Sequence, residues 1–155
     1  MELKQALQTA LDFEQKGHNL YEEVSNKTNN PIVSKTFRYL ANQELFHIEE
    51  IREYIEKLNN GNKIELKGDT LEDTKKFFTL TTKEFKEKTE LSDDDIKAHE
   101  TALELEQSAY NFYKEQHDQT DKEETKEFLK WLMEQENAHY ELIQKAQDFI
   151  KDPTV

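Results

Sequence analysis

Two segments of the sequence share one pattern: Gln43-Glu-Leu-Phe-His47 and Gln135-Glu-Asn-Ala-His139. Each consists of a glutamine followed by a Glu-x-x-His motif. On a helix, side chains three positions apart lie on the same face, so the carboxylate and the imidazole of each motif can reach one metal ion. The two histidines are 92 positions apart, and the same offset relates a longer part of the chain.

The segments that precede the two motifs also repeat at this offset. Residues 9–15 (Thr-Ala-Leu-Asp-Phe-Glu-Gln) align without a gap with residues 101–107 (Thr-Ala-Leu-Glu-Leu-Glu-Gln), so that Glu14 matches Glu106. Similarity within a chain at a fixed offset indicates a duplicated structural unit. The sequence therefore predicts a duplicated helix hairpin.

Helix is the expected conformation along nearly the whole chain. Only three glycines and two prolines interrupt a sequence rich in good helix formers, and apolar residues recur at spacings of three and four. We expect a single domain over residues 1–155, with a hairpin at 2–60, a connector at 61–91 and a hairpin at 92–150. A short helix is expected in the connector, opening at Thr70 and continuing through Phe85 and Leu91. The predicted fold class is all-α, a four-helix bundle that runs up-down-down-up.

Capping residues mark the expected helix ends. Asn30 and Pro31 suit the start of the second long helix, because asparagine caps well and proline is tolerated at the first helical position. Ser92, which is followed by three aspartates, suits the start of the third, where negative charge favours the positive end of the helix dipole. Thr120 and Glu123 have the spacing of a capping box for the fourth.

Composition and charge exclude several classes of function. Of the 155 residues, 35% are charged, and the formal net charge of −13 repels nucleic acid and anionic membranes. The sequence has no cysteine, so disulfides, a thiolate nucleophile and iron–sulfur ligation within it are excluded. No apolar stretch approaches the length of a membrane span, and the N-terminus has no apolar signal core. We expect a soluble, cytoplasmic protein that binds cations.

Glu14 and Glu106 interrupt apolar helix stripes, and this position points to a ligand. An ionised carboxylate in a core costs several kcal/mol unless it is paired or coordinates a metal. Together with Glu44 and Glu136, these carboxylates carry a charge of −4, which two divalent cations would neutralise. Two neutral imidazoles would complete the ligand set. Oxygen-rich sites with one nitrogen per ion suit iron or manganese, with zinc as a substitute.

These motifs resemble the ferritin-like superfamily, and within it the di-iron domain of the rubrerythrin family; bacterioferritin has the same six-ligand pattern. The resemblance covers nearly the whole chain and rests on residues 10–17, 43–47, 102–106 and 135–139. It implies two iron ions as the cofactor. It also implies six metal ligands that are the catalytic residues: Glu14, Glu44, His47, Glu106, Glu136 and His139.

The resemblance further implies a role for each ligand. Glu44 and Glu136 would bridge the two ions. The other four would form one pair for each ion: Glu14 with His47, and Glu106 with His139. Tyr21 and Tyr113 follow the first-helix and third-helix glutamates by seven residues, about two turns, and lie on the same faces. They are expected either to hydrogen-bond ligand carboxylates or to serve as ordinary packing.

The chain departs from the rubrerythrin pattern at two points. Rubrerythrins usually have an additional glutamate one turn after the third-helix ligand, and here that position is Ala109, with Gly17 as its counterpart. These small residues either leave space over the metals for dioxygen or peroxide, or permit close helix packing. A rubredoxin domain with its cysteines is also missing, so the expected electron donor is a separate protein such as a rubredoxin.

The remaining histidines and the acidic run have simpler interpretations. His18, His99 and His117 have no partner at ligand spacing and are expected at the surface or its boundary, although His18 lies one turn from Glu14. The segment 93–95 is a run of aspartates without the spacing of a calcium-binding loop, and helix capping explains it.

Three functions are compatible with the sequence. The first, implied by the resemblance, is an oxidoreductase in which a reduced di-iron centre donates electrons to hydrogen peroxide or dioxygen. The second is a ferroxidase that handles iron. The third, of another class, is a non-catalytic helical bundle. The expected assembly is a homodimer without a nucleic-acid or membrane partner.

Overall fold

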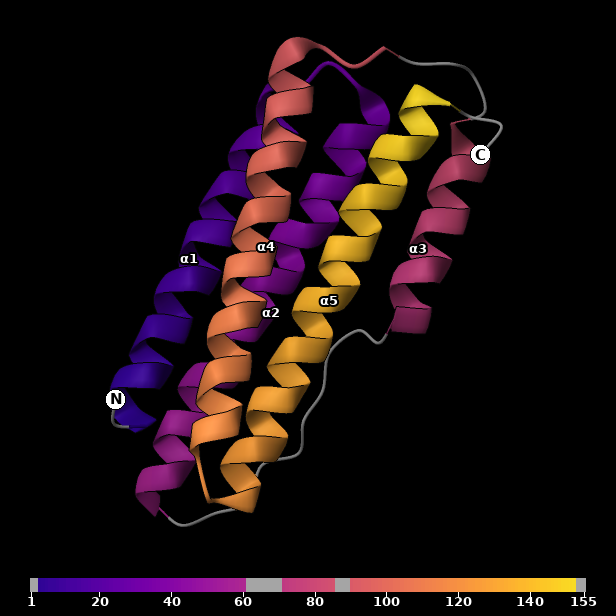
Figure 1. Cartoon of the computed structure of the whole chain (residues 1–155). Helices are drawn as coiled ribbons and strands as arrows, with labels where there is room; N and C mark the ends of the chain where they lie inside the picture. Colours follow the sequence, from indigo (N-terminus) through magenta and orange to yellow (C-terminus); the bar gives the residue numbers. More distant parts are fainter. Residues whose placement is uncertain (1–2, 61–70, 86–89, 153–155) are drawn as a thin grey trace.

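The computed structural model describes residues 3–60, 71–85 and 90–152, and all regular structure in these ranges is α-helical (Figure 1). The helices are α1 (Leu3–Lys27), α2 (Pro31–Asn60), α3 (Leu71–Glu84), α4 (Asp93–Gln119) and α5 (Glu123–Lys151). The all-α prediction is confirmed.

Four long helices form the bundle, and α3 lies beside it. α1 and α2 form one antiparallel hairpin, α4 and α5 form the other, α1 packs on α4, and α2 packs on α5. The chain rises along α1, descends along α2, descends again along α4 and rises along α5 (Figure 1). This is the predicted up-down-down-up order. The helix of the connector, α3, packs on the outside of α5 and also contacts α2.

Two of the three predicted helix starts are capped as expected. The Asn30 side chain accepts hydrogen bonds from the backbone N–H groups of Ile32 and Val33, at 2.9 and 3.1 Å. Ser92 and Asp95 form a reciprocal capping box at the start of α4. Caps of this kind contribute about 1 kcal/mol each. They fix the first residue of one bundle helix in each hairpin, α2 in the first and α4 in the second.

The predicted capping box at the start of the fourth bundle helix is wrong. Thr120 terminates α4, since its backbone N–H donates to the carbonyl of Gln116, and its hydroxyl accepts from the backbone N–H of Lys122 at 3.3 Å. Because α5 begins at Glu123, that glutamate is the first helical residue and not the third. Lys122 is the N-cap, and its side chain makes no capping hydrogen bond.

The connector helix is shorter than predicted. α3 ends at Glu84, so Phe85 and Leu91 lie beyond it; the expected opening at Thr70 lies outside the described residues. Phe85 and Leu91 still pack against the hydrophobic core. They reach it from non-helical backbone, because the chain must turn back here to begin α4 at Asp93.

The core consists of two apolar clusters separated by a polar layer. One cluster includes Leu7, Ile51, Tyr113 and Leu132, and the other includes Phe37. Along every bundle helix, the first cluster lies on one side of the Glu and His positions of the repeat, and the second lies on the other side. The polar layer is therefore closed at both ends by packed hydrocarbon and rings, which keeps water away from it.

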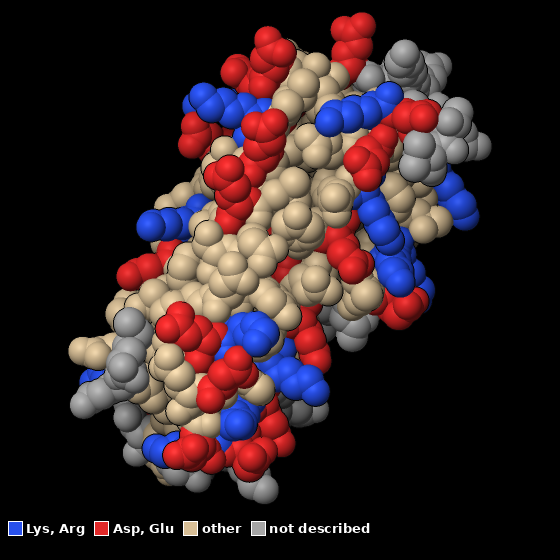
Figure 2. Space-filling model, in the orientation of Figure 1, with Lys and Arg blue, Asp and Glu red and all other residues tan. Residues whose placement is uncertain are grey.

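Charges of both signs are mixed on one face of the molecule. On the face drawn in Figure 2, basic side chains are intermingled with acidic ones and do not gather into one patch, so this face has no electrostatic footprint for nucleic acid. Among the described residues, none of the helices is both long and apolar enough to span a bilayer.

Candidate metal centre

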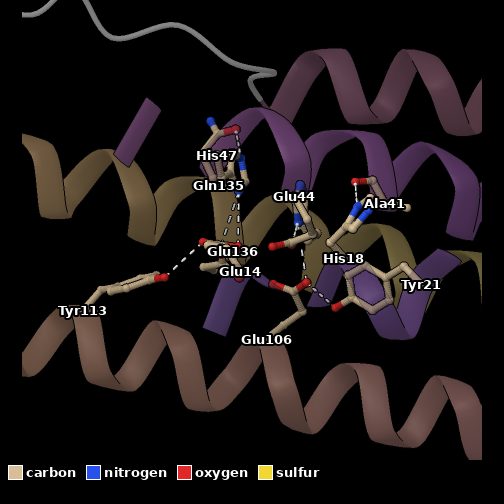
Figure 3. A network of polar contacts seen from close by, with 11 residues as sticks. Glu14, His18, Tyr21, Ala41, Glu44, His47, Glu106, Tyr113, Gln135 and Glu136 are labelled. Carbon is tan, nitrogen blue, oxygen red and sulfur yellow. Dashed lines mark hydrogen bonds and ion pairs between the residues drawn. The ribbon is translucent and has the colours of Figure 1, made fainter. Parts of the chain in front are cut away.

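The polar layer brings together the six residues that the sequence singled out. Each bundle helix contributes to it: α1 and α4 one glutamate each, and α2 and α5 one Glu-x-x-His pair each (Figure 3). All six side chains are at most 2% exposed: Glu14, Glu44, His47, Glu106, Glu136 and His139. Because all of them are polar and lie at one level of the bundle, their burial requires mutual contacts or a ligand.

The two histidines face the carboxylates in the same way. His47 Nδ1 lies 3.6 Å from an oxygen of Glu14 and 3.7 Å from one of Glu136. His139 Nδ1 lies 3.5 Å from an oxygen of Glu106, and the fourth contact, to Glu44 on the opposite hairpin, is described below. Each imidazole thus faces one glutamate of its own hairpin and one of the other.

The contact between His139 and Glu44 is shorter than the other three. His139 Nδ1 donates a hydrogen bond of 3.0 Å to Glu44 Oε1. The rings of His139 and His47 stack with centroids 5.1 Å apart and planes 13° from parallel. The two halves of the repeat therefore meet at this stack. They are related by approximate symmetry in the structure, as they are in the sequence.

Two buried tyrosines hold carboxylates across the hairpins. Tyr113 on α4 donates a hydrogen bond of 3.0 Å to Glu14 Oε1 on α1, and Tyr21 on α1 donates to Glu106 Oε1 on α4. Burial raises the pKa of both tyrosines well above the usual value, and the negative charge of the bonded glutamate raises it further. Both hydroxyls therefore stay protonated and act as donors.

The electrostatics of the layer show a deficit of positive charge. Burial raises the pKa of Glu136 well above its usual value, and the charges of Glu106 and Glu14 add to the increase. Burial also acts to raise the pKa of Glu106, but hydrogen bonds with Glu136, His139 and Tyr21 and the charge of His139 outweigh it and lower this pKa. A proton on Glu136 thus relieves the repulsion, as a bound cation would.

The donor atoms fit a metal ion. Ligand atoms of Glu44, His47, Glu136 and His139 all lie within 4.8 Å of one another. Among the described residues, four buried atoms of this layer have no hydrogen-bond partner: His47 Nδ1, Glu106 Oε2, Glu136 Oε1 and His139 Nε2. Unpartnered buried polar atoms are rare in proteins and call for a missing water or ion. Carboxylate oxygens with imidazole nitrogens are the donor set of iron and manganese sites.

A comparison with protein families agrees with this geometry. The family model described as Rubrerythrin matches residues 5–147, which include all four bundle helices in large part and the whole polar layer. The chain belongs to the rubrerythrin family. No curated protein and no solved structure gives a significant match.

In this rubrerythrin-family chain, Gly17 accommodates a carboxylate. A Cβ atom placed on Gly17 would lie 3.1 Å from both Cδ and Oε2 of Glu44, which is closer than ordinary van der Waals contact. The space beside Gly17 is therefore filled by Glu44 and is not an open cavity for a small molecule. Its counterpart Ala109 is also buried and offers no ligand atom.

Two residues that the sequence reasoning missed hold the outer side of His47. His47 Nε2 donates to Gln135 Oε1 at 3.0 Å, and the edge of the Trp131 ring meets the His47 ring with centroids 5.5 Å apart. A signal for Gln135 was present in the sequence, because the glutamine is repeated before both Glu-x-x-His motifs. Trp131 has no such signal, since Tyr39 stands at the matching position.

The expectation for His99 is wrong. This histidine is fully buried: its Nδ1 contacts the backbone carbonyl of Asp95 at 2.7 Å, and its ring meets Phe37 edge to face. Burial lowers its pKa, so the neutral form packs in the core. His18 and His117 are half-buried, as expected for the boundary, and His18 Nδ1 contacts the carbonyl of Ala41 on α2 at 2.9 Å (Figure 3).

Proposed function

We propose that this chain holds a di-iron centre in its polar layer and uses it to reduce hydrogen peroxide, with electrons from a separate donor protein. One observation carries the proposal: four helices bring two imidazoles and four carboxylates into one buried layer, and among the described residues several of its atoms, including His47 Nδ1 and Glu136 Oε1, have no hydrogen-bond partner. Membership in the rubrerythrin family supports the same assignment. A structural bundle alone would not need this arrangement, since apolar residues would pack the layer at lower cost.

The contacts support a proposed role for each ligand. Glu44 and Glu136 each face a histidine of the opposite hairpin, so they are suited to lie between two ions. The remaining residues form two same-hairpin pairs, one for each ion: Glu14 with His47, and Glu106 with His139. Each member of a pair lies within 3.6 Å of the other. Four carboxylates and two divalent ions form a neutral cluster, which lowers the cost of burial.

The protein side chains would keep this cluster in one arrangement. When bound, a pair of ferrous ions supplies the two electrons that, with two protons, convert one hydrogen peroxide into two waters. Tyr113 occupies Oε1 of Glu14 and leaves Oε2 turned toward His47, so the hydrogen bond orients the carboxylate for an ion. The two apolar clusters above and below exclude bulk water and limit loss of electrons to other reactions.

Reducing equivalents must return to the centre after each turnover. The sequence contains no cysteine, so no iron–sulfur group can lie within it. The donor is therefore proposed to be a separate one-electron carrier protein, such as a rubredoxin, that delivers two electrons in succession.

A ferroxidase is the second candidate, and Ala109 favours it. The additional glutamate that rubrerythrins usually carry would stand at this position, and the buried alanine has no oxygen to offer. The remaining six-residue set is the pattern that the sequence shares with bacterioferritin. In this case ferrous ion is the substrate, dioxygen is the oxidant, and iron uptake continues beyond two ions per chain.

Stopped-flow oxidation of the ferrous protein separates these functions. The metal-free chain is loaded anaerobically with two ferrous ions and mixed with hydrogen peroxide or with dioxygen, and the near-ultraviolet absorption of ferric iron is followed. Faster oxidation by peroxide supports the proposed function, and continued uptake of iron with dioxygen supports the ferroxidase. The Glu44→Ala variant should lose both reactions, whereas Glu49→Ala, an exposed glutamate on the same helix, should retain them. Two irons per chain in Glu44→Ala would refute the ligand assignment.

A further inference from the structure

The internal repeat pairs each residue of one hairpin with an equivalent residue, its twin, 92 positions away. The twins His47 and His139 differ in the residues that contact the outer side of the imidazole ring. On the His47 side, Gln135 accepts a hydrogen bond of 3.0 Å from Nε2, and Trp131 packs its edge on the ring. Because Gln135 Oε1 can only accept, His47 Nε2 is the donor in this contact. Nδ1 of His47 faces the carboxylates and has no hydrogen-bond partner among the described residues.

The His139 side is arranged differently. The twin of Gln135 is Gln43, and among the described residues neither Oε1 of Gln43 nor Nε2 of His139 has a hydrogen-bond partner. The twin of the tryptophan is Tyr39, which stacks at 4.0 Å on Phe77 of α3. The aromatic residue at this position therefore packs on the connector helix, which lies outside the repeat.

The nitrogen of His139 that faces the carboxylates, Nδ1, also differs from Nδ1 of His47 in its contacts. Nδ1 donates a hydrogen bond of 3.0 Å to Glu44 Oε1. An ion can bind His47 Nδ1 without breaking a hydrogen bond. An ion at His139 Nδ1 must displace the hydrogen bond to Glu44, and Nε2 on the outer side of the ring has no partner among the described residues to hold the ring in place. The two halves therefore differ in the cost of binding an ion.

We propose that Gln135 is a positioning residue that prepares His47 for a metal ion, and that the ion of the Glu14–His47 pair binds first and more tightly than the ion of the Glu106–His139 pair. This inference rests on the proposed two-ion centre. An outer partner that fixes the tautomer and orientation of a metal-binding histidine is worth about 10–100-fold in affinity. The twin, Gln43, makes no such contribution, which provides an internal control.

Titration with Co²⁺ tests the order of binding. The metal-free chain is titrated while the fluorescence of Trp131, the single tryptophan, is recorded, and bound Co²⁺ is counted by equilibrium dialysis. Because Trp131 contacts His47, most of the quenching should accompany the first ion. Gln135→Leu should weaken this first step about 10–100-fold, and Gln135→Glu, which keeps an acceptor oxygen, should bind as the wild type does. Gln43→Leu should leave the first step unchanged.

A second measurement needs no variant. Nitrogen NMR of the wild-type, metal-free chain with ¹⁵N-labelled histidine should show a proton on Nε2 of His47, held in the hydrogen bond to Gln135. An Nε2 of His47 without a proton, or equal effects of Gln135→Leu and Gln43→Leu on the first binding step, would overturn the inference while leaving the two-ion centre intact. A wild-type chain that binds fewer than two ions would instead refute the proposed function.

Discussion

Replacing Gly17 by alanine should affect the metal-free and the metal-bound protein in opposite directions. A glycine in a helix interior costs about 0.5–1 kcal/mol relative to alanine, so the helix itself should gain that amount. The new Cβ would lie 3.1 Å from Cδ and Oε2 of Glu44, whereas ordinary contact begins at 3.4 Å, so the carboxylate must retreat by about 0.3 Å. In the metal-free protein the end of this flexible side chain can move at small cost.

With an ion bound, Glu44 is held from both sides and cannot retreat without losing coordination. We therefore expect Gly17→Ala to raise the melting temperature of the metal-free protein by about 1–4 °C and to weaken Co²⁺ binding about tenfold, or about 1.4 kcal/mol. Thermal unfolding with and without Co²⁺ measures both effects.

The twin position provides the matched control. Ala109→Gly should destabilise the protein by about 0.5–1 kcal/mol through helix propensity and leave Co²⁺ affinity nearly unchanged. If Gly17→Ala bound Co²⁺ as tightly as the wild type, or if its metal-free form were less stable than the wild type, the reasoning about the Glu44 carboxylate would be refuted.

Three further predictions concern single contacts. Tyr113→Phe should lower the free energy of unfolding by about 1.5–3 kcal/mol, because Glu14 loses a buried donor; a loss below about 0.5 kcal/mol in urea unfolding would contradict this. Burial lowers the pKa of His99 in the fold, so above its unfolded value of 6.5 the residue contributes no pH dependence, and as the pH falls below 6.5 the unfolded state binds the extra proton and stability falls. His99→Gln should flatten this slope between pH 6.5 and more acid values in urea titrations, and an unchanged slope would assign it to other groups. Asn30→Ala should cost about 1 kcal/mol, because two backbone N–H groups at the start of α2 lose their acceptor, and Asn29→Ala, one residue earlier in the turn, is the control.

The repeat made most of the fold predictable. Its offset of 92 residues defines two equal hairpins, and the long connector between them leaves few topologies other than up-down-down-up. The same repeat drew attention to Glu14 and Glu106, which are polar residues within apolar stripes, and the structure brings both into the buried layer. Their role as metal ligands stays a prediction, since it depends on an ion.

What the sequence did not predict are the contacts between hairpins. The spacing placed Tyr21 on the face of Glu14, yet its hydroxyl bonds Glu106 on the other hairpin, because the crossing of α1 and α4 determines which carboxylate is in reach. His99 was expected at the boundary because it has no partner at ligand spacing. Its burial follows from Phe37 on α2 and from the backbone of its own helix, neither of which periodicity reveals.

The asymmetry between the two halves also lies beyond the sequence pattern. Gln43 and Gln135 occupy the same place in the repeat, so sequence alone predicts the same contact for both. The environments of the two glutamines differ in the fold: Tyr39 stacks on Phe77 of the connector helix, whereas its counterpart Trp131 packs against His47. A helix between the hairpins can therefore differentiate two halves that are similar in sequence.

The central claim, that the six buried residues bind two metal ions, is tested most directly by anomalous diffraction from crystals of the chain grown anaerobically with ferrous ion. We expect two anomalous peaks inside the bundle, one beside Glu14 and His47 and one beside Glu106 and His139, with the carboxylates of Glu44 and Glu136 between them. A single peak, no peak in the layer, or iron bound only at surface carboxylates would contradict the claim.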